Sequence, residues 1–239
     1  MFKYTASQQI VLPIAFLVIL AFSILLAILL KNKSERIKKI PFIIISVLLL
    51  VLELVKIIYY IKQGNYKRIL PLNFCTLILF ILPFANLKTN VFRSMAFVYT
   101  FMASIVLYVH PTATIGASAD NILLNFGNFH AFFYHHALVL YFLLALFTNF
   151  YKPKLKDCLW VSLGVAFYFA YAIPCSYALN SNYIGILRPY IPAFNALIDV
   201  FGQVGYSIIY GFICTVLVSL LVVIYYFLRK LFDNKKKNL

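Results

Sequence analysis

The chain has 239 residues, of which 64% are hydrophobic and 11% charged, and its formal net charge is +15 at pH 7. Soluble globular domains are about half apolar and about one quarter charged, so this composition excludes an ordinary soluble fold. The basic excess does not indicate nucleic-acid binding, because no RNA-binding module, zinc finger or aromatic-basic β motif accompanies it. In membrane proteins the same excess lies in cytoplasmic loops that face anionic lipid.

Apolar runs of bilayer length recur along the chain. A helix needs about 20 apolar residues to cross about 30 Å of hydrocarbon. The sequence therefore predicts an all-α polytopic transmembrane bundle, one integral domain over residues 1–239 with about seven spans. In chain order we expect the spans at residues 10–30, 40–61, 69–85, 91–109, 129–150, 158–179 and 205–228. Basic residues follow the first run instead of preceding it, which favours a retained span over a cleaved signal peptide.

The distribution of Lys and Arg predicts an orientation. With the N-terminus outside, the cytoplasmic segments hold 15 of these residues and the outer segments hold five. This bias predicts a multi-pass protein of the cell membrane, N-terminus out and C-terminus in, although the three basic residues at 62–68 oppose it. The segment 180–204 holds Pro189, Pro192 and the apolar stretch 191–201, and we expect a short helix there that lies on or re-enters the membrane.

The predicted second span carries two ionisable groups in mid-membrane, where such groups are costly. Glu53 and Lys56 are three residues apart on one helix face, and Tyr60 follows one turn later. Three interpretations fit this pattern: a self-neutralising pair that anchors the bundle, a proton relay, or a buried acid that orients a catalytic base.

The predicted third span opens with Leu-Pro-Leu-Asn-Phe-Cys-Thr at residues 70–76. Pro71 suits the first position of a helix, and the N–H groups of a first turn can hold an anion. Cys75 lies in this turn, where the positive end of a helix favours the thiolate. The pattern predicts either a nucleophilic thiol or a thiol packed between helices, with Asn73 and Thr76 on another face. The other three cysteines are scattered singly, so no disulfide framework and no metal site is expected.

The predicted fifth span opens on His130 and continues through Tyr134, His135 and His136. At about 100° per residue the three imidazoles point in different directions, so they do not form a one-face metal site. Histidine is the usual general base near neutral pH, and one of the three is a candidate for that role.

With the predicted orientation, these polar groups lie in the outer half of the bundle. Glu53 is about 12 Å below the outer end of its span at 1.5 Å per residue. Groups from the second, third, fifth and sixth spans therefore converge in one leaflet, and Asn182-Tyr183 lies at the same end. We expect a pocket in that half of the bundle.

Three patches in this order resemble the YwaF-like family of bacterial integral membrane proteins, which is similar to a eukaryotic transmembrane acyltransferase family that remodels phospholipids. They are Leu-Pro-Leu-x-x-Cys at residues 70–75, Phe-Phe-Tyr-His-His-Ala-Leu-Val at 132–139, and Asn182-Tyr183 followed by Leu-Arg-Pro at 187–189, Leu-Ile-Asp at 197–199 and Gly202. Asn73 stands where relatives commonly have histidine.

The resemblance implies acyl transfer or hydrolysis on a membrane lipid, without a cofactor. Cys75 would be the nucleophile and His136 the base, with His135 its competitor and His130 the third candidate. First-turn N–H groups of the third span would form the oxyanion hole. The lipid would lie against Asn73, Glu53, Lys56, Tyr60, Asn182, Tyr183 and Arg188.

Two other functions fit the same residues. A small-molecule or ion transporter would use Glu53–Lys56 on its pathway, as intramembrane charge pairs often do. A non-catalytic membrane subunit would need a partner protein, which the sequence does not identify.

Overall fold

The computed structural model describes residues 6–70, 72–87, 90–115 and 125–237. Every regular element in these four ranges is a helix, and none of them contains a β-strand. The predicted all-α fold class is therefore confirmed. The described chain divides into two compact units, residues 1–70 with 78–151 and residues 71–77 with 152–239. Each unit is described separately below, and the single domain over 1–239 stays a prediction.

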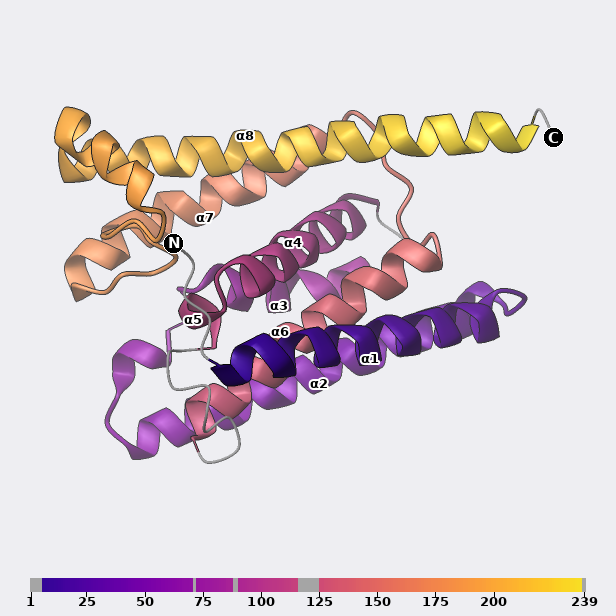
Figure 1. Ribbon diagram of the computed structural model, residues 1–239, viewed down its shortest axis with the longest axis horizontal. Coiled ribbons are helices and arrows are strands. Elements are labelled where there is room, and N and C mark those ends of the chain that lie inside the picture. Colours follow the sequence, from indigo (N-terminus) through magenta and orange to yellow (C-terminus); the bar gives the residue numbers. More distant parts are fainter. Residues whose placement is uncertain (1–5, 71, 88–89, 116–124, 238–239) are drawn as a thin grey trace. The chain divides into compact units, whose positions relative to one another are not determined.

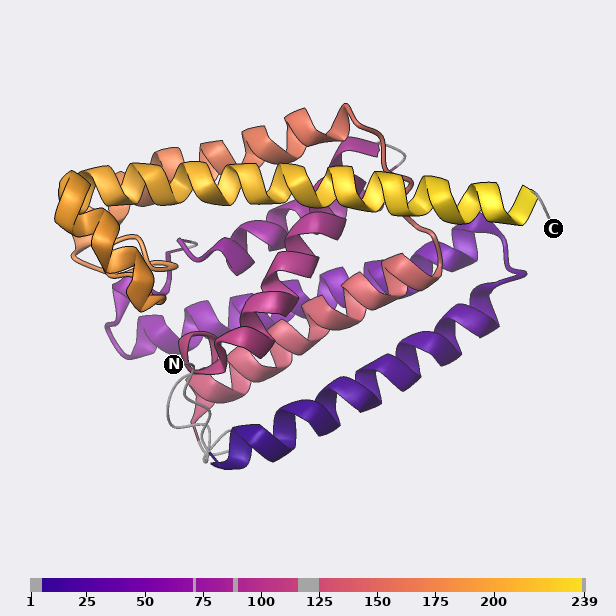
Figure 2. The same cartoon turned by 45° about the horizontal axis from the view of Figure 1, so that its top comes forward.

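The first unit is built around α6, which contacts four other helices of the unit (Figures 1 and 2). Its elements are α1 (Ala6–Leu30), α2 (Glu35–Lys62), η1 (Tyr66–Arg68), residues 78–85 of α3 (Phe74–Ala85), α4 (Asn90–Val109), α5 (Pro111–Thr114) and α6 (Phe126–Phe147). Helices α1, α2 and α4 all pack on α6. Half of the residues of α6 are buried, whereas α1 exposes most of its apolar surface, as expected of a helix that faces lipid.

Helix α6 begins three residues earlier than the apolar run predicts, because Asn125 caps it. The Oδ1 atom of Asn125 accepts the N–H of Gly127 at 2.9 Å and that of Asn128 at 3.4 Å. These bonds satisfy amides that a helix start leaves without an intrahelical partner. The cap therefore places His130 in the second turn of α6, inside the bundle.

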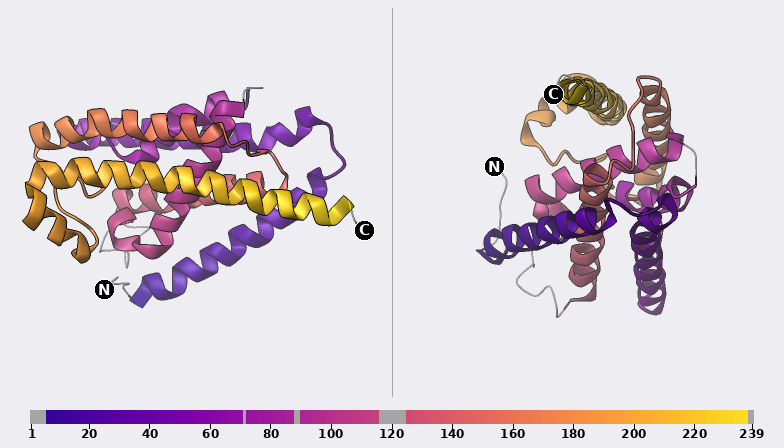
Figure 3. Two further views of the ribbon diagram at one scale, coloured as in Figure 1. Left: turned by 90° about the horizontal axis from the view of Figure 1, so that it is seen from above. Right: turned by 90° about the vertical axis from the view of Figure 1, so that its right-hand side faces the viewer.

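The second unit is a pair of long helices that lie side by side, α7 (Asp157–Leu179) and α8 (Asn195–Lys237) (Figures 1 and 3). Small and polar side chains let them approach: Ser162 and Ser219 share a hydrogen bond between their hydroxyls. A Cβ added at Gly211 would lie 2.9 Å from Cγ of Phe169, so only glycine permits this contact.

The start of α8 is bent at Gly202, whose φ of 70° and ψ of 175° are not helical. The chain passes through η3 (Pro192–Phe194) and a helical segment at 195–201 before this bend. The predicted short helix within 191–201 is therefore confirmed, while its place relative to a membrane stays a prediction.

Six helices within the described residues are long and apolar enough to cross a membrane. The third predicted span differs, because its helix, α3 (Phe74–Ala85), has 12 residues. Twelve residues extend about 18 Å, against about 30 Å of hydrocarbon. The chain before this helix forms the η1 turn at residues 66–68, and the helix begins only at residue 74. Pro71, which was predicted to be the first helical residue, lies outside the described residues. The chain is a multi-pass membrane protein, and its N-out orientation stays a prediction.

Candidate functional site

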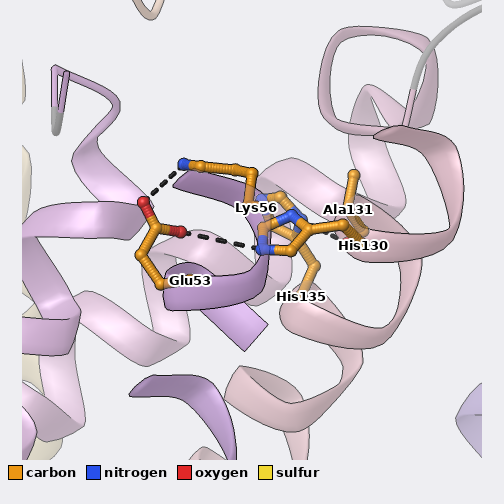
Figure 4. A network of polar contacts seen from close by, with 5 residues as sticks. All are labelled: Glu53, Lys56, His130, Ala131 and His135. Carbon is orange, nitrogen blue, oxygen red and sulfur yellow. Dashed lines mark hydrogen bonds and ion pairs between the residues drawn. The ribbon is translucent and has the colours of Figure 1, made fainter. Parts of the chain in front are cut away.

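The first unit contains a buried cluster of charged and ionisable groups, shown in Figure 4. Glu53, Lys56 and His130 are 4%, 8% and 8% exposed. The Nζ atom of Lys56 donates to Oε1 of Glu53, and Nε2 of His130 lies 3.6 Å from Oε2 of the same carboxylate. One carboxylate therefore faces an ammonium group on one oxygen and an imidazole on the other.

The cluster follows from the packing of α2 on α6. The buried residues of α2 recur every three or four positions from Phe42 to Tyr60, and Glu53 and Lys56 belong to this stripe. The stripe faces α6, and His130 is among the buried residues that α6 turns inward. The helix face that Glu53, Lys56 and Tyr60 were predicted to share is thus buried. It packs against α6, the helix that carries the three histidines.

The imidazole of His130 is held by aromatic rings as well as by Glu53. Tyr134 stacks on it with ring centroids 5.3 Å apart, and Phe126 lies 6.2 Å away. The 3.6 Å separation from Glu53 is longer than an ordinary hydrogen bond. It is an ion-pair distance only when the ring carries a proton, and the Lys56 ammonium on the same carboxylate opposes that positive charge.

The other two histidines are oriented by the backbone of their own helix. Nδ1 of His135 lies 2.7 Å from the carbonyl oxygen of Ala131, and Nδ1 of His136 lies 2.7 Å from that of Phe132. A carbonyl oxygen only accepts, so both rings carry a proton on Nδ1 and present Nε2 as the basic atom. His136 is buried beside Tyr108, with ring centroids 6.1 Å apart, whereas His135 is half-buried. The three rings diverge, as the helical spacing predicts.

A third basic residue borders this cluster, and the sequence did not identify it as a site residue. Arg68 donates from Nη1 to the hydroxyl of Tyr60 at 2.8 Å, and its guanidinium lies 5.2 Å from the centre of the Tyr60 ring. A Cβ at Gly127 would lie 2.8 Å from the same hydroxyl. The glycine in the first turn of α6 therefore allows Tyr60 and Arg68 to reach this end of the helix. In the sequence, the only indication of a role for Arg68 was that it belongs to the three basic residues at 62–68, on the side predicted to be outside.

Cys75 lies in the second unit, in the first turn of α3. The carbonyl of Asn73 accepts the N–H of Thr76 at 2.9 Å and that of Leu77 at 3.3 Å, which starts the helix. Asn73 itself is exposed and lies just before the helix, Thr76 is buried, and Cys75 is half-buried. The thiol is thus at a helix start, as predicted, and is partly accessible. All four cysteines are described, and all are thiols, not disulfides.

The polar residues after α7 form a tight turn. Oδ1 of Asn182 accepts the N–H groups of Leu187 and Arg188 at 2.8 and 2.9 Å, and its Nδ2 donates to the Arg188 carbonyl at 3.0 Å. Tyr183 is buried and Arg188 is exposed. Of the predicted lipid contacts in this unit, Asn182 thus uses its side chain to close the turn, whereas Arg188 and Asn73 are exposed.

The predicted site residues therefore fall into two groups. Glu53, Lys56, Tyr60 and the three histidines belong to the first unit. Cys75, Asn73, Asn182, Tyr183 and Arg188 belong to the second. The structure places the α2 pair beside His130 of α6, and the pairing of Cys75 with a histidine stays a prediction.

Comparison with known proteins identifies the family. A search of curated proteins and a search of solved structures gave no significant match. The model of the TMEM164 family matches residues 4–226, which is nearly the whole chain. This chain therefore belongs to the TMEM164 family, a family of transmembrane proteins.

Proposed function

We propose that this protein transfers or hydrolyses acyl groups of membrane lipids, with Cys75 as the nucleophile and a histidine of α6 as the base. The observation that carries the proposal is the buried contact between His130 and Glu53. A carboxylate beside an imidazole is the arrangement that holds a general base in place and stabilises its protonated form. The resemblance to the YwaF-like and acyltransferase families adds the nucleophile.

The reaction is that of a Cys–His acyl enzyme. The imidazole takes the thiol proton, and the Cys75 sulfur attacks the ester carbonyl. The ester C–O bond breaks, and the leaving alkoxide takes the proton back from the imidazolium. A second hydroxyl, from an acceptor lipid or from water, then gives its proton to the imidazole and cleaves the thioester. The thiol is regenerated and the acyl group is transferred or released.

Among the three histidines, His130 is the best candidate for the base. Glu53 faces its Nε2, so a carboxylate holds this ring. His136, which the family resemblance favours, is held by a neutral backbone carbonyl instead. The charge of Glu53 favours a developing positive charge on the ring, which a neutral carbonyl does less, although the Lys56 ammonium on the same carboxylate offsets part of this effect.

Replacing His130 by glutamine should lower acyl turnover by about 10²- to 10⁴-fold, the usual contribution of a general base. The assay follows a fluorescent acyl chain from phosphatidylcholine vesicles to water or to added lysolipid, with purified protein. His135→Gln and His136→Gln are the matched controls, and thermal unfolding in detergent confirms that each variant is folded. Loss of turnover in His136→Gln alone would replace His130 by His136 as the base. Full turnover in all three variants would exclude the mechanism.

A second function, small-molecule or ion transport, is favoured by one observation, the burial of the Glu53–Lys56 pair within the spans. Ion-coupled uptake into vesicles that is lost in Glu53→Gln and unchanged in Cys75→Ala would support it over acyl transfer. We further propose that the protein resides in the cell membrane and that lipids are its main partners.

A further inference from the structure

Arg68 is an exposed arginine whose guanidinium is held in place by a buried tyrosine. It ends the η1 turn that follows α2, and its Nη1 atom donates to the hydroxyl of Tyr60 at 2.8 Å. The guanidinium carbon lies 5.2 Å from the centre of the Tyr60 ring, which adds a cation–π contact. Tyr60 is 6% exposed and belongs to the buried stripe of α2. An arginine that is already held in this way loses less freedom when it binds a ligand.

This hydrogen bond leaves donors unused on both side chains. A guanidinium has five N–H groups, and within the described part of the chain Arg68 gives one of them to an acceptor, Tyr60. The Tyr60 hydroxyl accepts that bond, and no described residue accepts the proton of the hydroxyl itself. A buried phenol without an acceptor for its proton is costly. The two side chains therefore present a phenol donor and guanidinium donors at one point, where a ligand could supply the acceptor.

The surroundings of this point favour a negatively charged acceptor. A Cβ added at Gly127 would lie 2.8 Å from the Tyr60 hydroxyl and 3.6 Å from Nη1 of Arg68, so the donors lie against the first turn of α6. The first turn of a helix carries partial positive charge. The sequence has no Asp or Glu at residues 54–68 or 125–138 that would compete for the donors. Arginine with a second donor beside it is a common arrangement for binding phosphate.

The depth of these donors matches the shape of a phospholipid. Gly127 precedes His130 by three residues of α6, about 4.5 Å at 1.5 Å per residue. Tyr60 follows Glu53 by about two turns of α2, so on both helices the donors lie nearer the helix end than the Glu53–His130 contact (Figure 4). In a glycerophospholipid the ester carbonyls lie one glycerol unit deeper than the phosphate. A phosphate at Arg68 would therefore place the esters near the depth of His130.

Tyr66 favours a lipid headgroup over a free phosphate ion as the ligand. It belongs to the same turn as Arg68 and is 69% exposed. Exposed tyrosines are typical of the membrane interface, where phospholipid headgroups lie. The end of α2 thus combines an interfacial tyrosine with the fixed donors of Arg68 and Tyr60.

We propose that Arg68 and Tyr60 bind the phosphate of a phospholipid, with the guanidinium and the phenol as donors. This site names the part of the lipid by which the substrate is recognised, and that role in turnover rests on the proposed function. The binding itself does not, because it needs neither Cys75 nor an ester bond. The site also gives a role to one of the three basic residues at 62–68 that oppose the predicted orientation.

The test is the binding of a fluorescent dialkyl phosphatidylcholine to purified full-length protein in a detergent without phosphate. Both chains of this lipid are joined by ether bonds, so no acyl chemistry can act on it. The comparison lipid is a dialkyl glycerol with the same chains and fluorophore but without the headgroup. Arg68→Gln should weaken binding of the phospholipid about tenfold, as expected for the loss of a charge-assisted hydrogen bond. Tyr60→Phe keeps the ring and should weaken it about threefold.

Neither substitution should change binding of the dialkyl glycerol, which separates phosphate recognition from a packing effect. Because choline is a cation, a loss caused by removing Arg68 reports on the phosphate. Lys62→Gln is the matched control, since Lys62 is an exposed cation at the end of α2, and it should bind both lipids as the wild-type protein does. Thermal unfolding confirms that each variant is folded.

Three results would overturn the site: equal weakening in Lys62→Gln and Arg68→Gln, equal loss of both lipids in Arg68→Gln, or full phospholipid binding in folded Arg68→Gln. Displacement of the phospholipid by millimolar inorganic phosphate would assign the donors to a free anion and overturn the headgroup as their ligand. If binding depends on Arg68 and the protein transfers no acyl group, the site stands and the proposed function fails. Acyl turnover with full phospholipid binding in Arg68→Gln would keep the proposed function and remove the site.

Discussion

Replacing Cys75 by alanine should abolish acyl turnover altogether, because the reaction then has no atom to carry the acyl group. Removal of the nucleophile from comparable acyl enzymes costs on the order of 10⁶-fold in turnover. The expected loss is therefore larger than for His130, since a missing base slows the attack but does not remove the intermediate. The measurement is the same vesicle assay, together with the lipid profile of cells that produce the variant in place of the wild-type protein.

The chain supplies a matched control for Cys75. Cys175 is also half-buried and also a thiol, and it lies within α7 instead of at a helix start. Cys175→Ala should keep full turnover, which separates loss of the nucleophile from a general effect of removing a thiol. Cys75→Ala protein that unfolds at the wild-type temperature and retains turnover would exclude Cys75 as the nucleophile. A lipid profile unchanged both in this variant and in a full deletion would exclude lipid acyl chemistry.

Replacing Glu53 by alanine should lower the free energy of unfolding by about 3–5 kcal/mol, because Lys56 is then buried without its carboxylate. The same substitution also removes the group that faces His130. Thermal unfolding in detergent measures the loss of stability. The effect should be far larger than that of Glu35→Ala, which removes the exposed partner of Lys38 on the same helix.

A double substitution separates the structural role of this pair from its role in the reaction. Glu53→Leu with Lys56→Met replaces both charges by apolar groups of similar size, and such replacements are neutral or stabilising by about 1–4 kcal/mol. The double variant should therefore regain the stability that Glu53→Ala loses. It should still be inactive, since His130 has no carboxylate beside it. A stable and fully active double variant would show that the pair only anchors the bundle.

The sequence predicted the spans well where apolar runs define them and less well at their ends. Helix α4, Asn90–Val109, begins one residue before the predicted 91–109. Helix α2 starts at Glu35 instead of residue 40. Its first residues are mostly charged, so they extend the helix beyond the apolar run from which the span was predicted. Helix α6 starts at its Asn125 cap, a signal present in the sequence that hydropathy does not register.

The common face of Glu53 and Lys56 was predictable because it depends on helical spacing alone. The choice of His130 as their neighbour was not, since it depends on how α2 packs on α6. Arg68 was missed for the same reason, because its partner Tyr60 is eight residues away and is reached only through a turn. The Asn182 turn was visible as a motif, but its bonds to Leu187 and Arg188 required the backbone path.

The most direct test of the account is the intact mass of the purified protein after brief incubation with phosphatidylcholine vesicles of one acyl composition. A Cys–His acyl enzyme predicts an increase in mass equal to one acyl group, located on Cys75 by peptide mapping and removed by neutral hydroxylamine. The adduct should be absent in Cys75→Ala and present in Cys175→Ala. Turnover without any acyl adduct, or an adduct that persists in Cys75→Ala, would contradict the account.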